Sequence, residues 1–181
     1  MQRPALLVID MLNDFLEKWN RVHRDQLLCA INELVQIMRA ASRRQEFEPD
    51  LSDAFLEMRT KSIHTVIKGT AGAQIDAELK VAVSDTVIVK KRYSAFFGTD
   101  LDEILSRLQL DGFVLAGINT HACIRTTAID AYQRDRPVIL ASDCVDSYDE
   151  IPEATRIVVC AHSNNPRWMC SIRGPHQRHL Y

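Results

Sequence analysis

The alternation of short apolar runs with longer amphipathic segments predicts an α/β protein. Continuous apolar runs, typical of strands covered on both faces, occur at 5–9, 86–89, 113–116 and 137–141. Between these runs, apolar residues recur at helical spacing, most clearly over 26–41. Strands that alternate with helices indicate a three-layer α/β/α sandwich built on a mainly parallel sheet.

The segment 42–50 interrupts this pattern because it is polar and charged. A parallel sheet needs a strand soon after the helix at 26–41, yet the pattern predicts none here. A short helix is expected at 51–58 and a weak one at 75–83, with a short strand at 64–68. Either that short strand takes the missing place in the sheet or the sheet has a gap.

Composition narrows the class of protein. A chain of 181 residues is long enough for one sizeable core, so 1–181 is expected to be a single domain. Its 46% apolar and 25% charged residues are an ordinary globular balance. The net charge of -2 predicts no binding to nucleic acid or to an anionic membrane. The chain has no apolar run of about 18 residues, so no membrane span is predicted, and its start has no signal-peptide layout.

Cysteine and histidine spacing predicts no metal site. The five cysteines are odd in number and widely spread, which indicates reduced thiols and a cytoplasmic protein. The tail from about 150 is atypical: 156–161 reads as either a strand or a short helix. The tail histidines have no common ligand spacing; they are His162, His176 and His179. No cofactor is predicted.

Three residues with chemical potential follow three separate strands. Asp10 ends the first run, Lys90 ends the run at 86–89, and Cys123 follows the run at 113–116. The carboxyl ends of parallel strands meet at one edge of a sheet, so one crevice is predicted to hold all three. Cys123 is expected in the first turn of a helix, where the dipole favours a thiolate. The competing interpretations are a packed structural cysteine and an aspartate that only caps a turn.

An acid, an amine and a thiol in one crevice are suited to nucleophilic catalysis. Lys90 would hold Cys123 as a thiolate, and Asp10 would take the thiol proton and later give it to a leaving group. The polar residues just beyond Asp10, Asn13 and Asp14, are expected to brace a loop.

These residues lie in three segments that resemble the motifs of the isochorismatase-like cysteine hydrolases. The segments are 7–15, 90–101 and 117–123, the last followed by Thr127, Asp130 and Ala131. The spacing to Ser94-Ala95-Phe96 selects Lys90 over Lys91 as the family lysine. The resemblance implies a six-stranded, Rossmann-like sheet and a catalytic triad of Asp10, Lys90 and Cys123.

The resemblance also implies the surroundings of the triad. A cis peptide bond between Ile118 and Asn119 would aim the amides of Asn119 and Cys123 at an oxyanion. Substrate contacts are expected from loop residues, namely Phe15, Tyr93, Phe97 and His121. Members of the family imply a homodimer or homotetramer.

The predicted activity is hydrolysis of a small amide or related C–N bond through a Cys123 thioester. Relatives that cleave a vinyl ether resemble the second motif but have glycine in place of Cys123. The metal-binding Asp-x-His of the nicotinamidase branch has no counterpart after Arg44, so no metal is predicted. Two alternatives stay open: an inactive relative that serves as a binding or interaction protein, and a vinyl-ether hydrolase of isochorismatase type.

Overall fold

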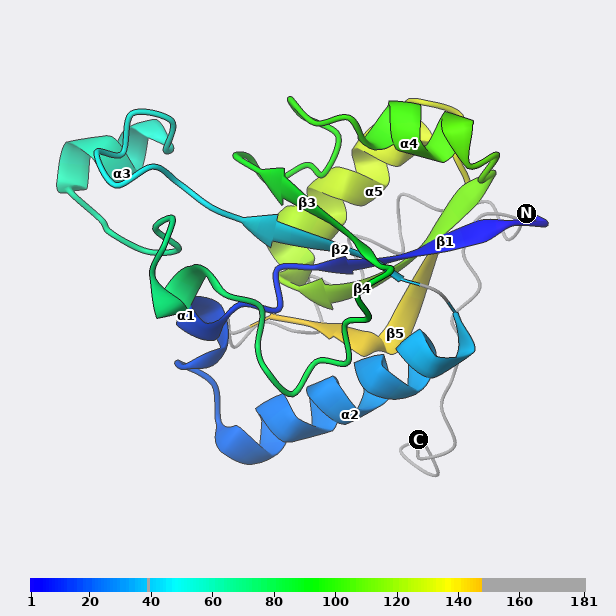
Figure 1. The fold of residues 1–181 in the computed structure, drawn as a ribbon, viewed down its shortest axis with the longest axis horizontal. Helices are drawn as coiled ribbons and strands as arrows, with labels where there is room; N and C mark the ends of the chain where they lie inside the picture. The colour runs from blue at the N-terminus through cyan, green and yellow to red at the C-terminus, as the bar shows by residue number, and fades with distance from the viewer. Residues whose placement is uncertain (39, 148–181) are drawn as a thin grey trace.

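The computed structural model describes residues 1–38 and 40–147, with 40–43 described by their backbone alone. Within these ranges, five parallel strands form one sheet in the order β3-β2-β1-β4-β5 (Figure 1). The strands are β1 Pro4–Ile9, β2 Ala40–Gln45, β3 Thr86–Lys90, β4 Gly112–Ile118 and β5 Val138–Asp146. The strand predicted as one option at 156–161, the tail from 150 and its histidines lie outside the described residues.

The strand β2 overturns the prediction for the region around 42–50. The helix predicted over 26–41 is α2, Arg21–Ile37, and the chain re-enters the sheet at Ala40. β2 pairs with β1 on one side and β3 on the other, so its hydrogen bonds come from both neighbours. Pairing with two neighbouring strands therefore makes this segment a strand in spite of its polar composition. The short strand predicted at 64–68 does not replace it, because Ile67 makes only an isolated bridge to Phe47.

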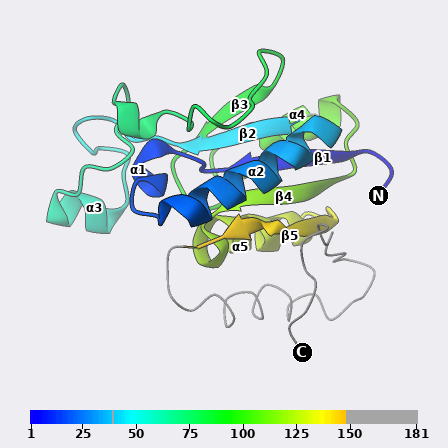
Figure 2. The same cartoon turned by 90° about the horizontal axis from the view of Figure 1, so that it is seen from below.

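Two helical layers cover the sheet (Figures 1 and 2). Alternate residues of β1 and β4, such as Leu7 and Leu115, pack against α4 (Leu101–Arg107) and α5 (Arg125–Tyr132). The intervening residues, such as Leu6 and Val114, pack against α2 on the opposite face. The period of two along each strand thus fills both cores and explains the unbroken apolar runs in the sequence.

Element boundaries differ from the predictions in three places. The helix predicted at 51–58 is α3, Leu56–Lys61. The segment 75–83 contains no helix. The last described strand, β5, continues to Asp146 and therefore carries polar side chains past the apolar run on which the prediction rested. Within the described ranges, no helix is long and apolar enough to cross a membrane.

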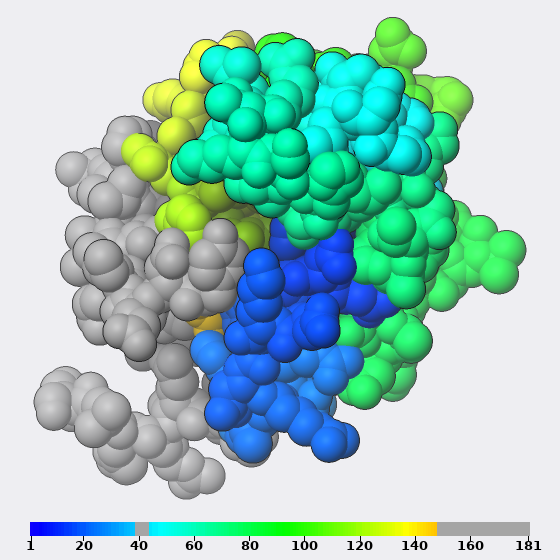
Figure 3. Space-filling view, turned by 90° about the vertical axis from the view of Figure 1, so that its left-hand side faces the viewer, coloured from blue at the N-terminus to red at the C-terminus, as the bar shows by residue number. Residues whose placement is uncertain are grey.

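The residues 47–75, here called the cap segment, lie beyond the carboxyl ends of β1 and β2 and contain α3 (Figures 1 and 3). The cap segment has a small apolar cluster of its own, formed with Leu12. Asn13 and Asp14, in the short helix α1 (Asn13–Leu16), attach it to β1. Asn13 Nδ2 donates to the Ala71 carbonyl at 2.8 Å, and Asp14 Oδ2 accepts from Thr65 and Val66. The predicted loop-bracing role of Asn13 and Asp14 is confirmed.

Gly117 is required where β4 approaches β1. Its φ is +109°, and a Cβ at this position would lie 2.1 Å from the Ile9 carbonyl oxygen. We expect Gly117→Ala to lower the free energy of unfolding by about 3 kcal/mol, since overpacking adds to the strain of a positive φ. Urea denaturation followed by circular dichroism would measure the change.

Gly98→Ala is the matched control. Gly98 also has a positive φ, +64°, but no atom lies within 4 Å of the position of its Cβ. Only the backbone strain remains, so the expected loss is about 1 kcal/mol. Equal losses at the two positions would show that the contact with Ile9 is unimportant.

Candidate active site

The sheet brings Asp10, Lys90 and Cys123 together at its carboxyl edge, which faces the viewer in Figure 3. Asp10 directly follows β1, and Lys90 is the last residue of β3. Cys123 lies in a π-helical turn, Thr120–Ile124, that follows β4. The strand order changes direction between β1 and β4, and such switch points open a crevice in parallel sheets.

The Lys90 ammonium is the centre of the cluster. Its Nζ lies 2.7 Å from Asp10 Oδ2 and donates to Cys123 Sγ at 3.4 Å and to the Arg92 carbonyl at 3.1 Å. An ammonium has three hydrogens, so these three acceptors use its full donor capacity. Asp10 and Lys90 are fully buried and Cys123 is nearly so.

Lys90 is held in its charged form. Burial by itself lowers the pKa of the Lys90 ammonium, but the charge of Asp10 and the hydrogen bonds to Asp10 and Cys123 outweigh it. The pKa of Lys90 is therefore raised, and the side chain stays an ammonium at neutral pH.

Cys123 is held as a thiol, contrary to the sequence-based expectation of a thiolate. Burial raises the pKa of Cys123 from 9.0, the charge of Asp10 raises it further, and Lys90 only partly opposes them. Because Asp10 already balances Lys90, a thiolate would give the buried cluster a net negative charge. The predicted position in the first turn of a helix is confirmed, because the π-helical turn Thr120–Ile124 runs directly into α5, so burial and the charge of Asp10 outweigh the helix dipole.

Asp10 has spare capacity to accept hydrogen bonds. Its φ is +56°, and both carboxylate oxygens are buried. Apart from the ion pair with Lys90 and a hydrogen-bond interaction with the Cys123 thiol, neither oxygen has a partner among the described residues. Buried carboxylates normally accept several hydrogen bonds, so this carboxylate is available to a neighbouring thiol or a ligand.

The end of β4 forms the next part of the site. The Ile118–Asn119 peptide bond is cis. The Ile118 side chain packs in the core beneath α2, whereas the Asn119 Oδ1 atom is buried without a partner among the described residues. Asn119 therefore offers a polar side chain at the strand end, and the Ile118 side chain does not.

The four loop residues predicted to contact substrate have different environments. Phe15 is half-buried and packs against the core under α2 and against the cap segment. Tyr93 stacks on Phe55 with ring centroids 4.7 Å apart, and Phe97 is 63% exposed. His121 Nδ1 is hydrogen-bonded to Ser147 Oγ. Their roles toward a substrate stay predictions.

Gln45 was missed by the sequence analysis. It is the last residue of β2, lies in register with Lys90, and has a buried Nε2 without a partner in the described part of the chain. A buried donor that lacks an acceptor at an edge where ligands bind is a candidate contact for substrate. Recognition of β2 would have revealed it, because Gln45 ends its strand as Lys90 ends β3.

The carboxylates after β2 are occupied by cations. Glu46 lies 3.0 Å from Arg44, and Glu48 lies 2.9 Å from Lys68. The hydrogen bond to Glu48 raises the pKa of Lys68. Among the described residues, no three histidine, cysteine or acidic side chains are grouped so as to hold a metal ion.

The chain is an α/β protein with a parallel five-stranded sheet in its described part, and Asp10, Lys90 and Cys123 are buried together at the carboxyl edge of that sheet. This combination of fold and site is that of the isochorismatase-like proteins. The chain belongs to the isochorismatase family, whose domain model matches residues 4–166. A probable inactive nicotinamidase of Arabidopsis thaliana is 34% identical over 75% of this chain and 76% of that protein. The maleamate amidohydrolase of Pseudomonas putida is 25% identical over 84% of this chain and 77% of that protein.

Solved structures agree with this assignment. An isochorismatase family protein of Desulfovibrio vulgaris superposes with a TM-score of 0.80 at 26% identity and covers 94% of both chains. The N-carbamoylsarcosine amidase of Thermoplasma acidophilum superposes with a TM-score of 0.75 at 25% identity, over 95% of this chain and 96% of that one. The predicted fold class and family are confirmed.

The charges around Cys123 predict opposite effects for two substitutions. Asp10→Asn removes an anion that raises the pKa of Cys123, so alkylation by iodoacetamide at pH 7 should become faster than in the wild type. Lys90→Met removes the cation that lowers this pKa, so alkylation should become slower. Lys90→Met also leaves Asp10 buried without a counter-ion, which should cost about 3–5 kcal/mol of stability.

The rates are measured peptide by peptide with mass spectrometry. The exposed Cys29 serves as an internal reference, since its rate should be the same in every variant. In the wild type, alkylation of Cys123 should be slow at pH 7 and rise with pH beyond 9.0, the ordinary thiol value. Fast alkylation of Cys123 at pH 6 would contradict the neutral thiol.

Proposed function

We propose that this chain is a cysteine hydrolase that cleaves a small amide or related C–N bond. The observation that carries the proposal is the buried contact of Lys90 with both Asp10, at 2.7 Å, and Cys123, at 3.4 Å. A thiol beside a carboxylate and a fixed positive charge has the parts of an activated nucleophile.

In the proposed reaction, Asp10 takes the Cys123 proton while the sulfur attacks the carbonyl carbon. The tetrahedral intermediate collapses, and the protonated Asp10 gives its proton to the departing nitrogen. Asp10 then deprotonates a water that attacks the thioester, which releases the carboxylic product, and the Asp10 proton returns to the Cys123 sulfur. The raised pKa of Cys123 fits this order, since the proton stays on sulfur until attack begins.

Lys90 has an electrostatic role in this scheme. Its three donors are already engaged, so it stabilises negative charge near Cys123 without giving up a proton. The developing oxyanion would be stabilised by the amides of Asn119 and Cys123, each worth roughly 3 kcal/mol when well placed. Two relatives named for C–N substrates, maleamate amidohydrolase and N-carbamoylsarcosine amidase, support this class of reaction.

The second candidate is an inactive relative that acts as a binding or interaction protein. The observation that favours it is the name of the relative with 34% identity, a probable inactive nicotinamidase. A vinyl-ether hydrolase is the third candidate, and Cys123→Gly separates it from the first. Ether cleavage should survive that substitution, whereas amide cleavage should not.

Ammonia release from a panel of small primary amides tests the first candidate. At least one amide should be hydrolysed, and Cys123→Ser should reduce kcat/KM by at least about 10³-fold, because the nucleophile is replaced by a weaker one. Cys29→Ser, at an exposed thiol, is the matched control and should leave the rate unchanged. Turnover that survives in Cys123→Ser would refute the proposed mechanism.

A further inference from the structure

The third acceptor of the Lys90 ammonium is a backbone carbonyl, that of Arg92, at 3.1 Å. The chain folds back after β3 so that a residue two positions downstream faces the side chain of Lys90. Each acceptor restricts where the remaining hydrogens of an ammonium can point. The place of the Arg92 carbonyl therefore determines how the other two hydrogens meet Asp10 and Cys123.

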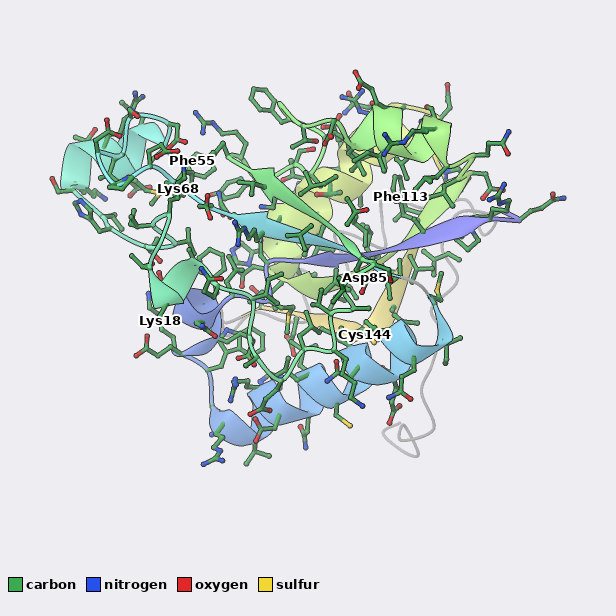
Figure 4. The ribbon with its side chains drawn as sticks, in the orientation of Figure 1. Lys18, Phe55, Lys68, Asp85, Phe113 and Cys144 are labelled. Atoms are coloured by element: carbon green, nitrogen blue, oxygen red, sulfur yellow. The ribbon has the colours of Figure 1, made fainter. Side chains whose placement is uncertain are left out.

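The side chain of Arg92 fixes its own backbone. Its Nη1 donates to the Lys91 carbonyl at 2.6 Å and to the Asp53 carbonyl at 2.8 Å. The guanidinium lies over the ring of Phe55, 5.1 Å from its centroid, a cation–π contact. Figure 4 shows Phe55 between α3 and the end of β3.

Both contacts outside its own loop reach the cap segment. Asp53 and Phe55 belong to that segment, and Phe55 also packs edge-on against Phe47 in it. The Asp53 carboxylate accepts from the Glu48 amide at 2.9 Å, which holds its loop in place. Arg92 therefore joins the cap segment to the side chain of Lys90.

Lys91 gives a natural comparison. Its Nζ lies 2.8 Å from Asp53 Oδ2, so it also ties the end of β3 to the cap segment. Its side chain is one-third exposed, and Lys90 donates to the carbonyl of Arg92, not to that of Lys91. Lys91 and Arg92 thus both attach the loop after β3 to the cap segment. Of the two residues, Arg92 supplies the backbone carbonyl that accepts from Lys90.

We propose that Arg92 is a positioning residue that couples docking of the cap segment to the alignment of Lys90 with Cys123 and Asp10. With the cap segment docked, the Arg92 carbonyl takes one ammonium hydrogen and directs the other two at the carboxylate and the sulfur. Without Asp53 and Phe55 in place, the guanidinium loses its contacts with the cap segment and keeps its hydrogen bond to the Lys91 carbonyl, so the Arg92 carbonyl is held less firmly. This inference rests on the proposed function, because it assigns Arg92 to the same site.

The test compares Arg92→Met with Lys91→Met, in the full chain. Arg92→Met should lower kcat about tenfold or more with a smaller change in KM, and should slow Cys123 alkylation at pH 7 by a similar factor. Lys91→Met should leave both within about twofold of wild type. Arg92→Lys keeps the positive charge but lacks the planar guanidinium group with its several donors. It should therefore recover part of the kcat that Arg92→Met loses.

The outcomes separate this inference from the proposed function. Equal losses in Arg92→Met and Lys91→Met, or none in Arg92→Met, would refute the positioning role even while Cys123→Ser abolishes turnover. Turnover that survives in Cys123→Ser refutes the proposed function instead. If Arg92→Met does not fold, as thermal unfolding would reveal, Phe55→Leu removes the ring beneath the guanidinium, a ring that also contacts Tyr93 and Phe47. That variant should then lower kcat, and a wild-type rate would overturn the inference.

Discussion

The buried ion pair between Lys90 and Asp10 is the interaction on which the site depends. Both side chains are fully removed from solvent, where desolvation of two charges costs several kcal/mol each. An apolar pair of the same size would serve the core at least as well. The pair is therefore best explained by what it does to a third group: it fixes a charge beside Cys123 while the carboxylate keeps the sulfur protonated.

The architecture supplies this arrangement from distant parts of the chain. β1 and β4 are neighbours, so Asp10 and Cys123 come close without long side chains. β3 is two strands from β1, with β2 between them, and only a long side chain such as that of Lys90 can bridge that width. The choice of lysine is thus a matter of reach as well as charge.

The sequence was sufficient for the layers, the parallel sheet and the three residues of the cluster, because unbroken apolar runs ending in Asp10 and Lys90 carry that information. β2 was not predictable from periodicity, since the polar chain from Ala40 to Gln45 gains its strand conformation from pairing with β1 and β3. The charge state of Cys123 was not predictable either. It depends on burial and on the balance between Asp10 and Lys90, which exist only once the strands are assembled.

The cap segment has a separate apolar cluster, built around Phe47, Leu51 and Met58, and it is fastened to the sheet at a few named points. A unit with its own core tolerates change on its outer surface without loss of the packing beneath the strands. Divergence in residues 47–75 can therefore alter which molecules reach the sheet edge while the sulfur, carboxylate and amine stay the same. Changes confined to the outer surface of the cap segment leave Asp53 and Phe55 against Arg92, so the entrance to the sheet edge can diverge while the alignment of Lys90 is kept.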